Sequence, residues 1–491
     1  MISNLLVYGH YLKLSVKGGV RVDLFRKKSI DTLIAGSQQG KTLKKELSAF
    51  DLAFLGIGAI IGTGIFVLTG VGALDAGPAL VISFIIAGLA CAFAAFNYAE
   101  FASLVPVSGS VYTYSYATLG EFIAWVIGWD LMLEYILAVS AVSVGWSGYF
   151  TNFLAGIGIE IPASLTAAPG SDPGAIINLP SLVIVMIIAF LLSIGVKESK
   201  WVNNLMVALK LIVVALVIVA GVFYVKPDNW TPFMPMGWDG VGLAAATVFF
   251  AYLGFDAVST AAEETRNPSR DLPKGILWSL GICTLLYILV SGIVTGIVPW
   301  QKFADHQDDP VAFALQFAGQ DWVAGIISVG AAIGMMTVML VMLYGQTRVG
   351  FAMSRDGLLP KWISKVHDKY RTPFASTWFY GTVCGLLGAF VPLDDLVKLV
   401  NMGTLAAFVL ISVAVWVLRV KQPDLPRKFR CPWVPVLPIL AIIFCGYLMF
   451  QLPGSTWLRF GIWLLIGIIF YFVYSRKNSK LNSASEAEKA S

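Results

Sequence analysis

The chain has 491 residues, of which 57% are hydrophobic and 13% are charged, and its formal net charge is +5. Because about a quarter of the residues of a soluble domain are charged, this composition excludes an ordinary soluble protein. Apolar stretches of the roughly 20 residues that cross a bilayer recur along the chain, so we expect an all-α polytopic membrane protein. The positive charge requires no nucleic acid, because basic loops beside anionic lipid account for it.

Twelve transmembrane helices are predicted between a basic segment at 1–48 and a polar cytoplasmic tail at 475–491 that is expected to be disordered. Their expected limits, in chain order, are 51–73, 77–100, 119–151, 178–197, 202–225, 239–264, 273–299, 323–351, 373–391, 395–419, 433–452 and 455–474. The segment 264–274, ETRNPSRDLPK, contains two X-Pro steps and is expected to be a stiff loop. Lysine and arginine gather in the loops after the fourth, sixth, eighth and tenth spans, which places both termini in the cytoplasm.

The first span carries an unusual number of glycines. Its sequence GIGAIIGTGIF, residues 56–66, contains four of them, although each costs a helix about 1 kcal/mol relative to alanine. The sixth span, TVFFAYLGFDAVSTAAEE, is interrupted at Gly254. Glycine-interrupted spans at corresponding positions of two halves indicate an inverted-repeat transporter whose binding site lies at the breaks. The alternative is close helix packing, because Gly58 and Gly62 also fit the small-xxx-small pattern.

An unwound span exposes backbone groups that bind ligands. The free N–H groups at the start of a half-helix suit a carboxylate, and the freed carbonyl groups of the preceding half suit an ammonium group. A site with both kinds of group suits a zwitterion. The two breaks therefore predict an amino acid as the substrate.

Five stretches carry a resemblance to a known family. They are GIGAIIGTGIFVL at 56–68, YAEFASLVPVSGSVYTYSYATLGEF at 98–122, GWDLMLEY at 128–135, FFAYLGFDAVSTAAEETRNPSRDLPKGI at 249–276 and QTRVGFAMSRDGLLP at 346–360. With these motifs the chain resembles the amino acid–polyamine–organocation superfamily and, within it, bacterial members of the cationic amino acid transporter family. The resemblance implies a LeuT-like fold, with a five-helix repeat at 49–225, a second and inverted one at 239–419, and two extra helices at 433–474.

The resemblance also implies which positions bind the substrate. The carboxylate is expected at the N–H groups of Gly62, Thr63 and Gly64, with the Thr63 hydroxyl as a second donor. The positions whose carbonyl groups are expected to surround the amino group are Ile60, Phe250, Ala251 and Leu253. An aromatic side chain, Tyr252 or the neighbouring Phe250, is expected to act as a gate over the bound ligand.

Lys210 lies inside the apolar stretch NNLMVALKLIVVALVIV of the fifth span. A charged lysine at such depth costs about 2.5–3.5 kcal/mol on insertion scales and is functional by default. The alternative, snorkelling to an interface, is difficult over the roughly 12 to 14 Å that eight or nine residues span at 1.5 Å each. Family members that need no sodium carry a lysine at this position. Lys210 is therefore expected to couple transport to protons and, when protonated, to donate to a carbonyl group of the first span.

Two acidic side chains are further candidates for the proton path. Glu134 lies in the third span, and Asp256 follows the break in the sixth; a packing role suits each of them equally well. Three methionines, Met335, Met339 and Met342, recur on one face of the eighth span. Such a stripe is usually core filling, and the alternative is a lining for the substrate side chain.

The first shell predicted around the substrate contains no acid, which favours small or neutral L-amino acids as substrates. Together with the coupling role expected of Lys210, this predicts sodium-independent, proton-coupled symport. The alternative is a cationic uniporter or exchanger for arginine or lysine, as the family name suggests. An enzyme is excluded, because all three histidines fall outside the apolar runs and the sequence has no HExxH motif. No cofactor or metal is expected. A channel would need a continuous polar pore, and the paired broken helices with one isolated lysine fit a gated binding site better. The expected partners are substrate, protons and the lipid of a bacterial cell membrane, and a small accessory subunit is left open.

Overall fold

The computed structural model describes residues 26–28, 47–104, 110–195, 200–425 and 427–481. These residues form helices and, beyond isolated bridges, no strand is found among them, which confirms the all-α prediction. By length and composition, the described helices that can cross a membrane number seven, namely Leu68–Leu104, Glu121–Gly156, Asn203–Tyr224, Pro268–Ile297, Asp321–Arg355, Leu393–Lys421 and Gly454–Asn478. Shorter apolar helices are Ala49–Ile60, Leu179–Ser193, Phe374–Phe390 and Val436–Gln451.

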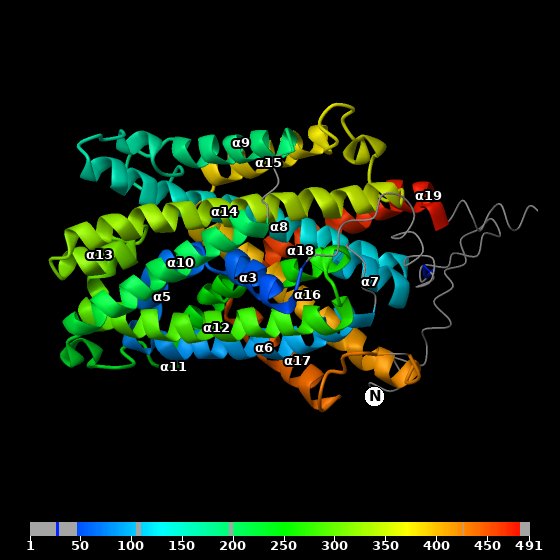
Figure 1. Ribbon diagram of the computed structural model, residues 1–491, viewed down its shortest axis with the longest axis horizontal. Helices are drawn as coiled ribbons and strands as arrows, with labels where there is room; N and C mark the ends of the chain where they lie inside the picture. Colours follow the sequence, from blue (N-terminus) through cyan, green and yellow to red (C-terminus); the bar gives the residue numbers. More distant parts are fainter. Residues whose placement is uncertain (1–25, 29–46, 105–109, 196–199, 426, 482–491) are drawn as a thin grey trace, which may run out of the picture.

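Most helices run side by side along the long axis of the molecule (Figure 1). In chain order they are α3 (Ala49–Ile60), α4 (Thr63–Phe66), α5 (Leu68–Ala76), α6 (Leu80–Leu104), α7 (Ser110–Thr118), α8 (Glu121–Gly156), α9 (Leu179–Ser193), α10 (Lys200–Gly221), α11 (Gly237–Val248), η6 (Phe249–Tyr252), η7 (Phe255–Glu264), α12 (Pro268–Ile297), η8 (Trp300–Asp305), α13 (Pro310–Phe317), α14 (Asp321–Arg355), α15 (Phe374–Phe390), α16 (Leu393–Lys421), α17 (Val436–Gln451), α18 (Gly454–Phe470) and α19 (Arg476–Asn478).

Helix α8 lies at the centre of the bundle and packs against α14, α15 and α16. In its most apolar stretch 83% of the residues are buried, compared with 22% in the segment Gly454–Asn478 at the periphery. This difference in burial distinguishes helices that face other helices from helices that face lipid. The central position of α8 brings its side chains close to both predicted breaks.

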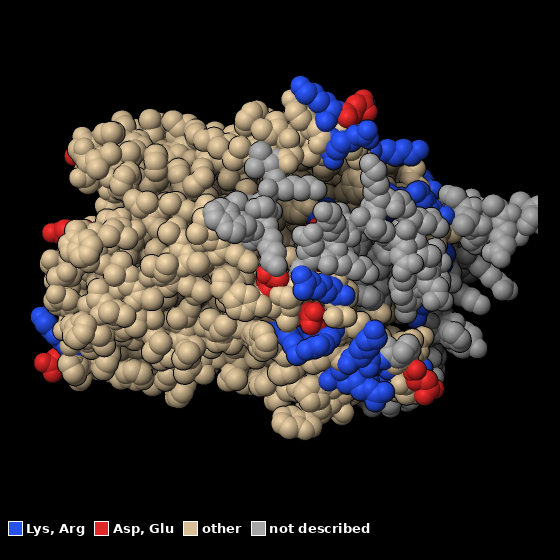
Figure 2. All heavy atoms as spheres, viewed as in Figure 1, with Lys and Arg blue, Asp and Glu red and all other residues tan. Residues whose placement is uncertain are grey.

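Charged side chains gather at one end of the molecule. Figure 2 shows most of the visible lysine and arginine side chains at the end where Figure 1 places α7 and α19, while the middle of this face carries no charge. Helix α13 lies at the opposite end. Such a distribution is typical of a protein whose middle is embedded in lipid.

Both ends of the described chain meet at the same end of the bundle. Near the N-terminus, Arg26 lies 3.6 Å from Glu121 and Lys28 pairs with Asp356. Near the C-terminus, the hydroxyl of Ser479 donates to Glu121 at 2.5 Å. The start of the tail is therefore folded, because α19 and its flanking serines are held by these contacts; residues 482–491 and most of 1–48 lie outside the described residues.

The prediction of a stiff loop at 264–274 is wrong, because most of this segment belongs to α12. This helix begins at Pro268, and the N–H groups of Arg270 and Asp271 both donate to the carbonyl of Asn267. Proline suits the first helical position, where its φ is already helical and its missing N–H would have had no intrahelical partner. The Asn-Pro step thus starts a helix here.

Candidate functional site

The first break lies between α3, which ends at Ile60, and α4, which begins at Thr63. Between them Gly62 is extended, with φ −163° and ψ −139°. Among the described residues, none accepts a hydrogen bond from the backbone N–H groups of Gly62, Thr63 or Gly64. Three adjacent donors at the start of a half-helix are therefore available to an anionic group.

The second break lies at Leu253 and Gly254. Helix α11 ends at Val248, the 3-10 turn η6 follows, and Gly254 then adopts φ +109°, a left-handed conformation that favours glycine. A side chain at this position would also come within 2.9 Å of the carbonyl oxygen of Ala59 in α3. The predicted interruption at Gly254 is thus a site where the backbone both turns and approaches the first broken span.

The two broken spans touch each other directly. A Cβ atom at Gly64 would overlap with the Cα atom of Ala251, so only glycine at position 64 allows α4 to lie against η6 in this way. The structure therefore brings Gly62, Thr63 and Gly64 next to a position in η6 that was expected to contribute carbonyl groups. Glycine at this point serves a close approach as well as an unwound backbone.

Tyr287 joins the two breaks and was missed by the sequence-based analysis. Its hydroxyl lies 3.0 Å from the carbonyl oxygen of Ile60 and 2.8 Å from that of Ala251. These are two of the carbonyl groups expected to bind the substrate amino group; a third, that of Phe250, accepts from the N–H of Leu253 at 3.1 Å. The only signal in the sequence is a single tyrosine within the aliphatic run TLLYILV.

Asn401 on α16 was also missed. Its side-chain amide donates to the carbonyl groups of Ala246 at 2.7 Å and Thr247 at 3.1 Å. These two residues lie at the end of α11, where the α-helix gives way to the 3-10 turn and the last carbonyl groups lose their intrahelical partners. Asn401 therefore stabilises the second broken span at the point where it begins to unwind.

Lys210 lies against the end of α3 and is fully buried. Its ammonium group donates to the carbonyl of Gly58 at 2.5 Å and to that of Ile61 at 3.0 Å. Space for the side chain comes from Gly334 in α14, where a Cβ atom would lie 3.2 Å from Lys210 Cε. The structure thus places a cation at the negative end of a helix dipole, within one turn of the Gly62 break.

The hydroxyl of Thr63 faces α14 and donates to the sulfur of Met335 at 3.2 Å. Its methyl group lies over Gly145 of α8, where a Cβ atom would come within 2.7 Å. Of the three methionines of the stripe, Met335 therefore borders the break directly. Val338 lies near it, 3.0 Å from a Cβ built at Gly62. The side chains around the first break are mostly apolar.

The structure places Glu134 and Asp256 near each other but ties them to different partners. Asp256 accepts a hydrogen bond from Tyr135 at 3.0 Å, while Glu134 interacts with Thr404 of α16. Both are nearly fully buried. A role in proton transfer stays a prediction for each of them.

The predicted gate residue Tyr252 faces α6. Its hydroxyl donates to the carbonyl of Phe84 at 2.7 Å, and its ring packs edge-on against that of Tyr287 with the ring centres 5.3 Å apart. The neighbouring Phe250 is 5% exposed, and Tyr252 is completely buried. A gating movement of Tyr252 would have to break its hydrogen bond to α6.

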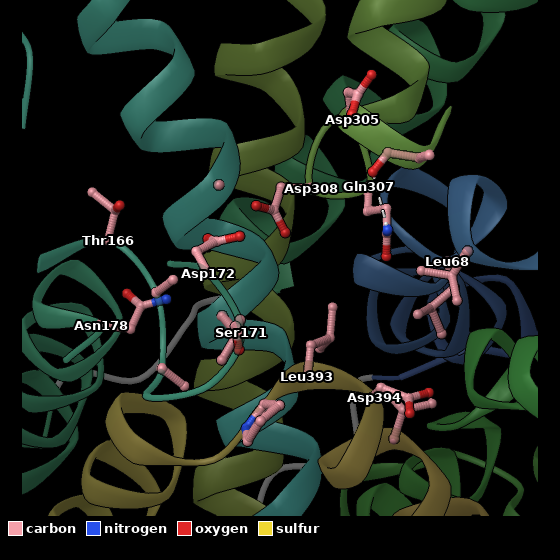
Figure 3. A pocket seen from close by; sticks show the side chains of 18 of the residues that line it. Leu68, Thr166, Ser171, Asp172, Asn178, Asp305, Gln307, Asp308, Leu393 and Asp394 are labelled. Carbon is pink, nitrogen blue, oxygen red and sulfur yellow. Dashed lines mark hydrogen bonds between the residues drawn. The ribbon is translucent and has the colours of Figure 1, made fainter. Parts of the chain in front are cut away.

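A cavity of about 360 Å³ lies beside residues 304–308, the segment that precedes α13. It extends from the acidic side chains shown in Figure 3 to Leu68 and Thr247, which lie two residues from α4 and from η6 respectively. Its inner end therefore lies beside the end of α4 and the end of α11, the two helices that adjoin the breaks.

Residues 47–476 match the amino acid permease family. The chain is 66% identical to the branched-chain amino acid permease BcaP of Bacillus subtilis (strain 168), over 95% of this chain and 100% of the relative. It is 59% identical to the methylthioribose transporter of the same organism, over 94% and 99% of the two chains. The vacuolar cationic amino acid transporter 4 of Arabidopsis thaliana is 31% identical, over 94% and 97%.

Proposed function

The chain belongs to the amino acid permease family, and from this membership we propose that it is a carrier of neutral L-amino acids with apolar side chains. Transport is driven by protons, needs no sodium and proceeds by alternating access in the membrane of a bacterial cell. The observation that carries this proposal is the pair of contacting breaks, where free N–H groups of α4 lie beside carbonyl groups of α3 and η6.

The architecture that we propose is the LeuT-like arrangement of two inverted five-helix repeats, 49–225 and 239–419, followed by two further helices. Support comes from the breaks themselves, one in α3–α4 and one in η6–η7. The seven long and four shorter apolar helices correspond to eleven of the twelve proposed spans. The broken segment of α11, η6 and η7 would be the remaining one, the sixth. The end rich in lysine and arginine faces the cytoplasm, so α13 and the cavity face the outside.

A zwitterionic substrate fits the groups at the breaks. Its carboxylate accepts from the N–H groups of Gly62, Thr63 and Gly64, at the positive end of the half-helix. Its ammonium group donates to the carbonyl groups of Ile60 and Ala251. The Tyr287 hydroxyl lies within hydrogen-bond distance of both carbonyl groups but has a single proton to donate, whereas an ammonium group has three. A bound substrate thus satisfies acceptors that the protein satisfies only in part.

Lys210 couples this site to protons. Its bonds to Gly58 and Ile61 hold the end of α3 that adjoins the break. Charge-assisted hydrogen bonds are roughly twice as strong as neutral ones, so loss of the proton loosens this end of α3 and favours its movement. A sodium ion is not required, because the ammonium group supplies the positive charge beside the broken helix.

The substrate side chain is apolar in this proposal. Thr63, Met335 and Val338, which lie beside the first break, offer no carboxylate to a second positive charge. The permease at 66% identity carries a name that refers to branched-chain amino acids. The relative at 59% identity makes methylthioribose the competing candidate, because its thioether would also suit an apolar pocket.

The test is uptake of radiolabelled leucine into proteoliposomes in sodium-free buffer, with and without an inward proton gradient. Unlabelled isoleucine, arginine and methylthioribose serve as competitors. We expect accumulation above equilibrium only with the gradient, and competition by isoleucine. Accumulation that ignores the gradient would contradict proton coupling. Stronger competition by arginine or methylthioribose than by isoleucine would contradict the proposed substrate.

Substitution Lys210→Met tests the coupling residue in the same assay. Methionine fills the space beside Gly334 but carries no proton, so we expect gradient-driven accumulation to fall to the equilibrium level while leucine–leucine exchange persists. The exposed lysine Lys226 provides the matched control, because Lys226→Met removes an equal charge outside the site. Gradient-driven uptake that survives in Lys210→Met would exclude this lysine as the coupling group.

A further inference from the structure

A lid of residues 299–317 covers one side of the cavity described above. It consists of η8, a short turn and α13, and its own small core contains Phe303 and Phe313, whose rings meet edge to face at 6.1 Å. His306 stacks on Phe313 with the ring centres 3.7 Å apart. The lid is thus a preformed unit whose position depends on its contacts with the helices around it.

The lid rests on two helices at glycines. A Cβ atom at Gly70 of α5 would lie 2.7 Å from Pro310, and one at Gly148 of α8 would lie 2.6 Å from the Cβ atom of Asp308. Such close approaches leave no room for a layer of water at these points. Helix α5 continues from α4, so the lid sits directly on the outer half of the first broken span.

Two adjacent carboxyl groups lie in this contact. Asp309 is 8% exposed, is in contact with Asn152 of α8 and lies 3.8 Å from His306. The side chain of Asp308 packs against Gly148 and faces Asp172 of the α8–α9 connection. Figure 3 shows the side chains of Asp308 and Asp172 next to each other in the cavity. Closing the lid therefore removes negative charge from water and brings like charges together.

We propose that Asp308 and Asp309 form a proton-operated latch, which holds the lid closed on α8 and α5 when both carboxyl groups are neutral and releases it when they are charged. This goes beyond the proposed function, because it adds a second point, outside the membrane, at which protons act. It also gives the cavity an entrance whose opening follows external pH.

The electrostatic surroundings support this direction. Burial raises the pKa of Asp309 to about 7, and the neighbouring Asp308 adds to the rise. The pKa of Asp308 is raised too, first by its low-dielectric surroundings and then by Asp172. Burial lowers the pKa of His306, so this ring becomes positively charged only at a lower pH than an ordinary imidazole.

The other titratable groups around the latch do not reverse the direction of this pH dependence. Tyr149 of α8 interacts with both carboxyl groups, and Asp305 and Asp394 line the same cavity. All three are neutral or negative, and Lys398 pairs with Asp394 at 2.5 Å. The carboxyl groups bind protons more tightly when the lid is closed, because closure raises their pKa. Protonation therefore stabilises the closed lid fully below pH 4, near the ordinary carboxyl pKa, and this stabilisation is lost as the pH rises through about 7.

Tyr149 also links the latch to the first broken span. Its hydroxyl donates to the carbonyl of Phe66, the last residue of α4, at 2.7 Å. The same side chain lies against the backbone of Val311 and Ala312 at the start of α13. A shift of the lid therefore acts on the end of α4, whose other end carries the N–H groups of the break.

The experiment measures the distance between spin labels on Gln301→Cys in η8 and Ile157→Cys at the end of α8, both exposed positions, in nanodiscs without substrate. Between pH 8.5 and pH 5 we expect the ratio of short to long distances to rise tenfold or more. The double variant Asp308→Asn/Asp309→Asn, which mimics two neutral carboxyl groups, is expected to give the short distance throughout. Asp305→Asn is the matched control and should keep the pH dependence.

A distance distribution that ignores pH in the unsubstituted lid would overturn the proposal, as would an undiminished pH dependence in the double variant. The single variants Asp308→Asn and Asp309→Asn are measured as well, and each is expected to weaken the pH dependence, so that one poorly folded protein does not decide the result. The readout requires no transport. If Lys210 proves not to couple transport to protons, the lid measurement is unaffected. If the lid does not respond to pH, the transport test of Lys210 is likewise unaffected.

Discussion

The hydroxyl group of Tyr287 lies between two carbonyl groups that belong to different broken spans. A buried carbonyl that loses its hydrogen bond costs about 1–3 kcal/mol. This single hydroxyl provides a hydrogen-bond donor for the carbonyl groups at the end of α3 and in η6. A substrate ammonium group that donates to the same carbonyl groups would take over part of this role.

Tyr287→Phe is expected to lower the melting temperature of the substrate-free protein and to enlarge the stabilisation that leucine gives. The reason is that the ligand then supplies donors that the protein lacks. Thermal unfolding with and without leucine measures both effects. Tyr252→Phe is the matched control, because its hydroxyl serves Phe84 of α6; a leucine-induced shift in Tyr287→Phe no larger than in the unsubstituted protein would show that the ammonium group binds elsewhere.

At the scale of elements, the contact of α4 with η6 depends on the absence of a side chain at Gly64. Overpacking a buried contact costs about 1–3 kcal/mol, and here the added atom would meet backbone, which has little freedom to move. The short α4 and the 3-10 turn are thus positioned by each other. Neither half of the site is complete alone.

Gly64→Ala is therefore expected to separate the two broken spans and to weaken leucine binding at least tenfold, together with a loss of stability. Equilibrium binding of radiolabelled leucine to the purified protein is the measurement. Gly281→Ala in α12, where a Cβ atom would meet nothing within 4 Å, should bind leucine normally. Full binding in Gly64→Ala would mean that the substrate does not use both spans.

Proline and glycine had different predictive value in these elements. Gly254 marked a real break, because its left-handed φ and its approach to Ala59 both require glycine. Pro268 was read as part of a loop and instead begins α12. An X-Pro step restricts the residue before the proline, but it does not tell whether a helix has just ended or is about to start.

At the scale of the whole molecule, residues near the two ends of the described chain meet at Glu121, at the start of α8. Its carboxylate accepts from Tyr116 at 2.9 Å, Tyr471 at 3.0 Å and Ser479 at 2.5 Å, and Arg26 approaches to 3.6 Å. The end of α19 passes close over Gly357, where a Cβ atom would overlap with the carbonyl of Asn478. This network fastens the C-terminal segment to the central helices.

Glu121→Gln is expected to release the C-terminal segment, because an amide has one acceptor oxygen and no charge for the donors around it. Hydrogen bonds to charged groups contribute about 1.5–3 kcal/mol each. Limited proteolysis should cut the chain after Tyr471 faster, and the melting temperature should fall. Glu160→Gln, at an exposed loop position, should change neither. Unchanged protection of the segment in Glu121→Gln would show that the carboxylate does not hold it.

By itself the sequence determined the class of the protein, the positions of both breaks and the buried lysine. These features are local: apolar length, glycine in an apolar run and a charge at membrane depth each have a physical consequence that needs no knowledge of neighbours. Only the tertiary structure decided which groups meet. Tyr287, Asn401 and Tyr149 are ordinary side chains in sequence, and their hydrogen bonds to freed carbonyl groups arise because distant helices pack side by side.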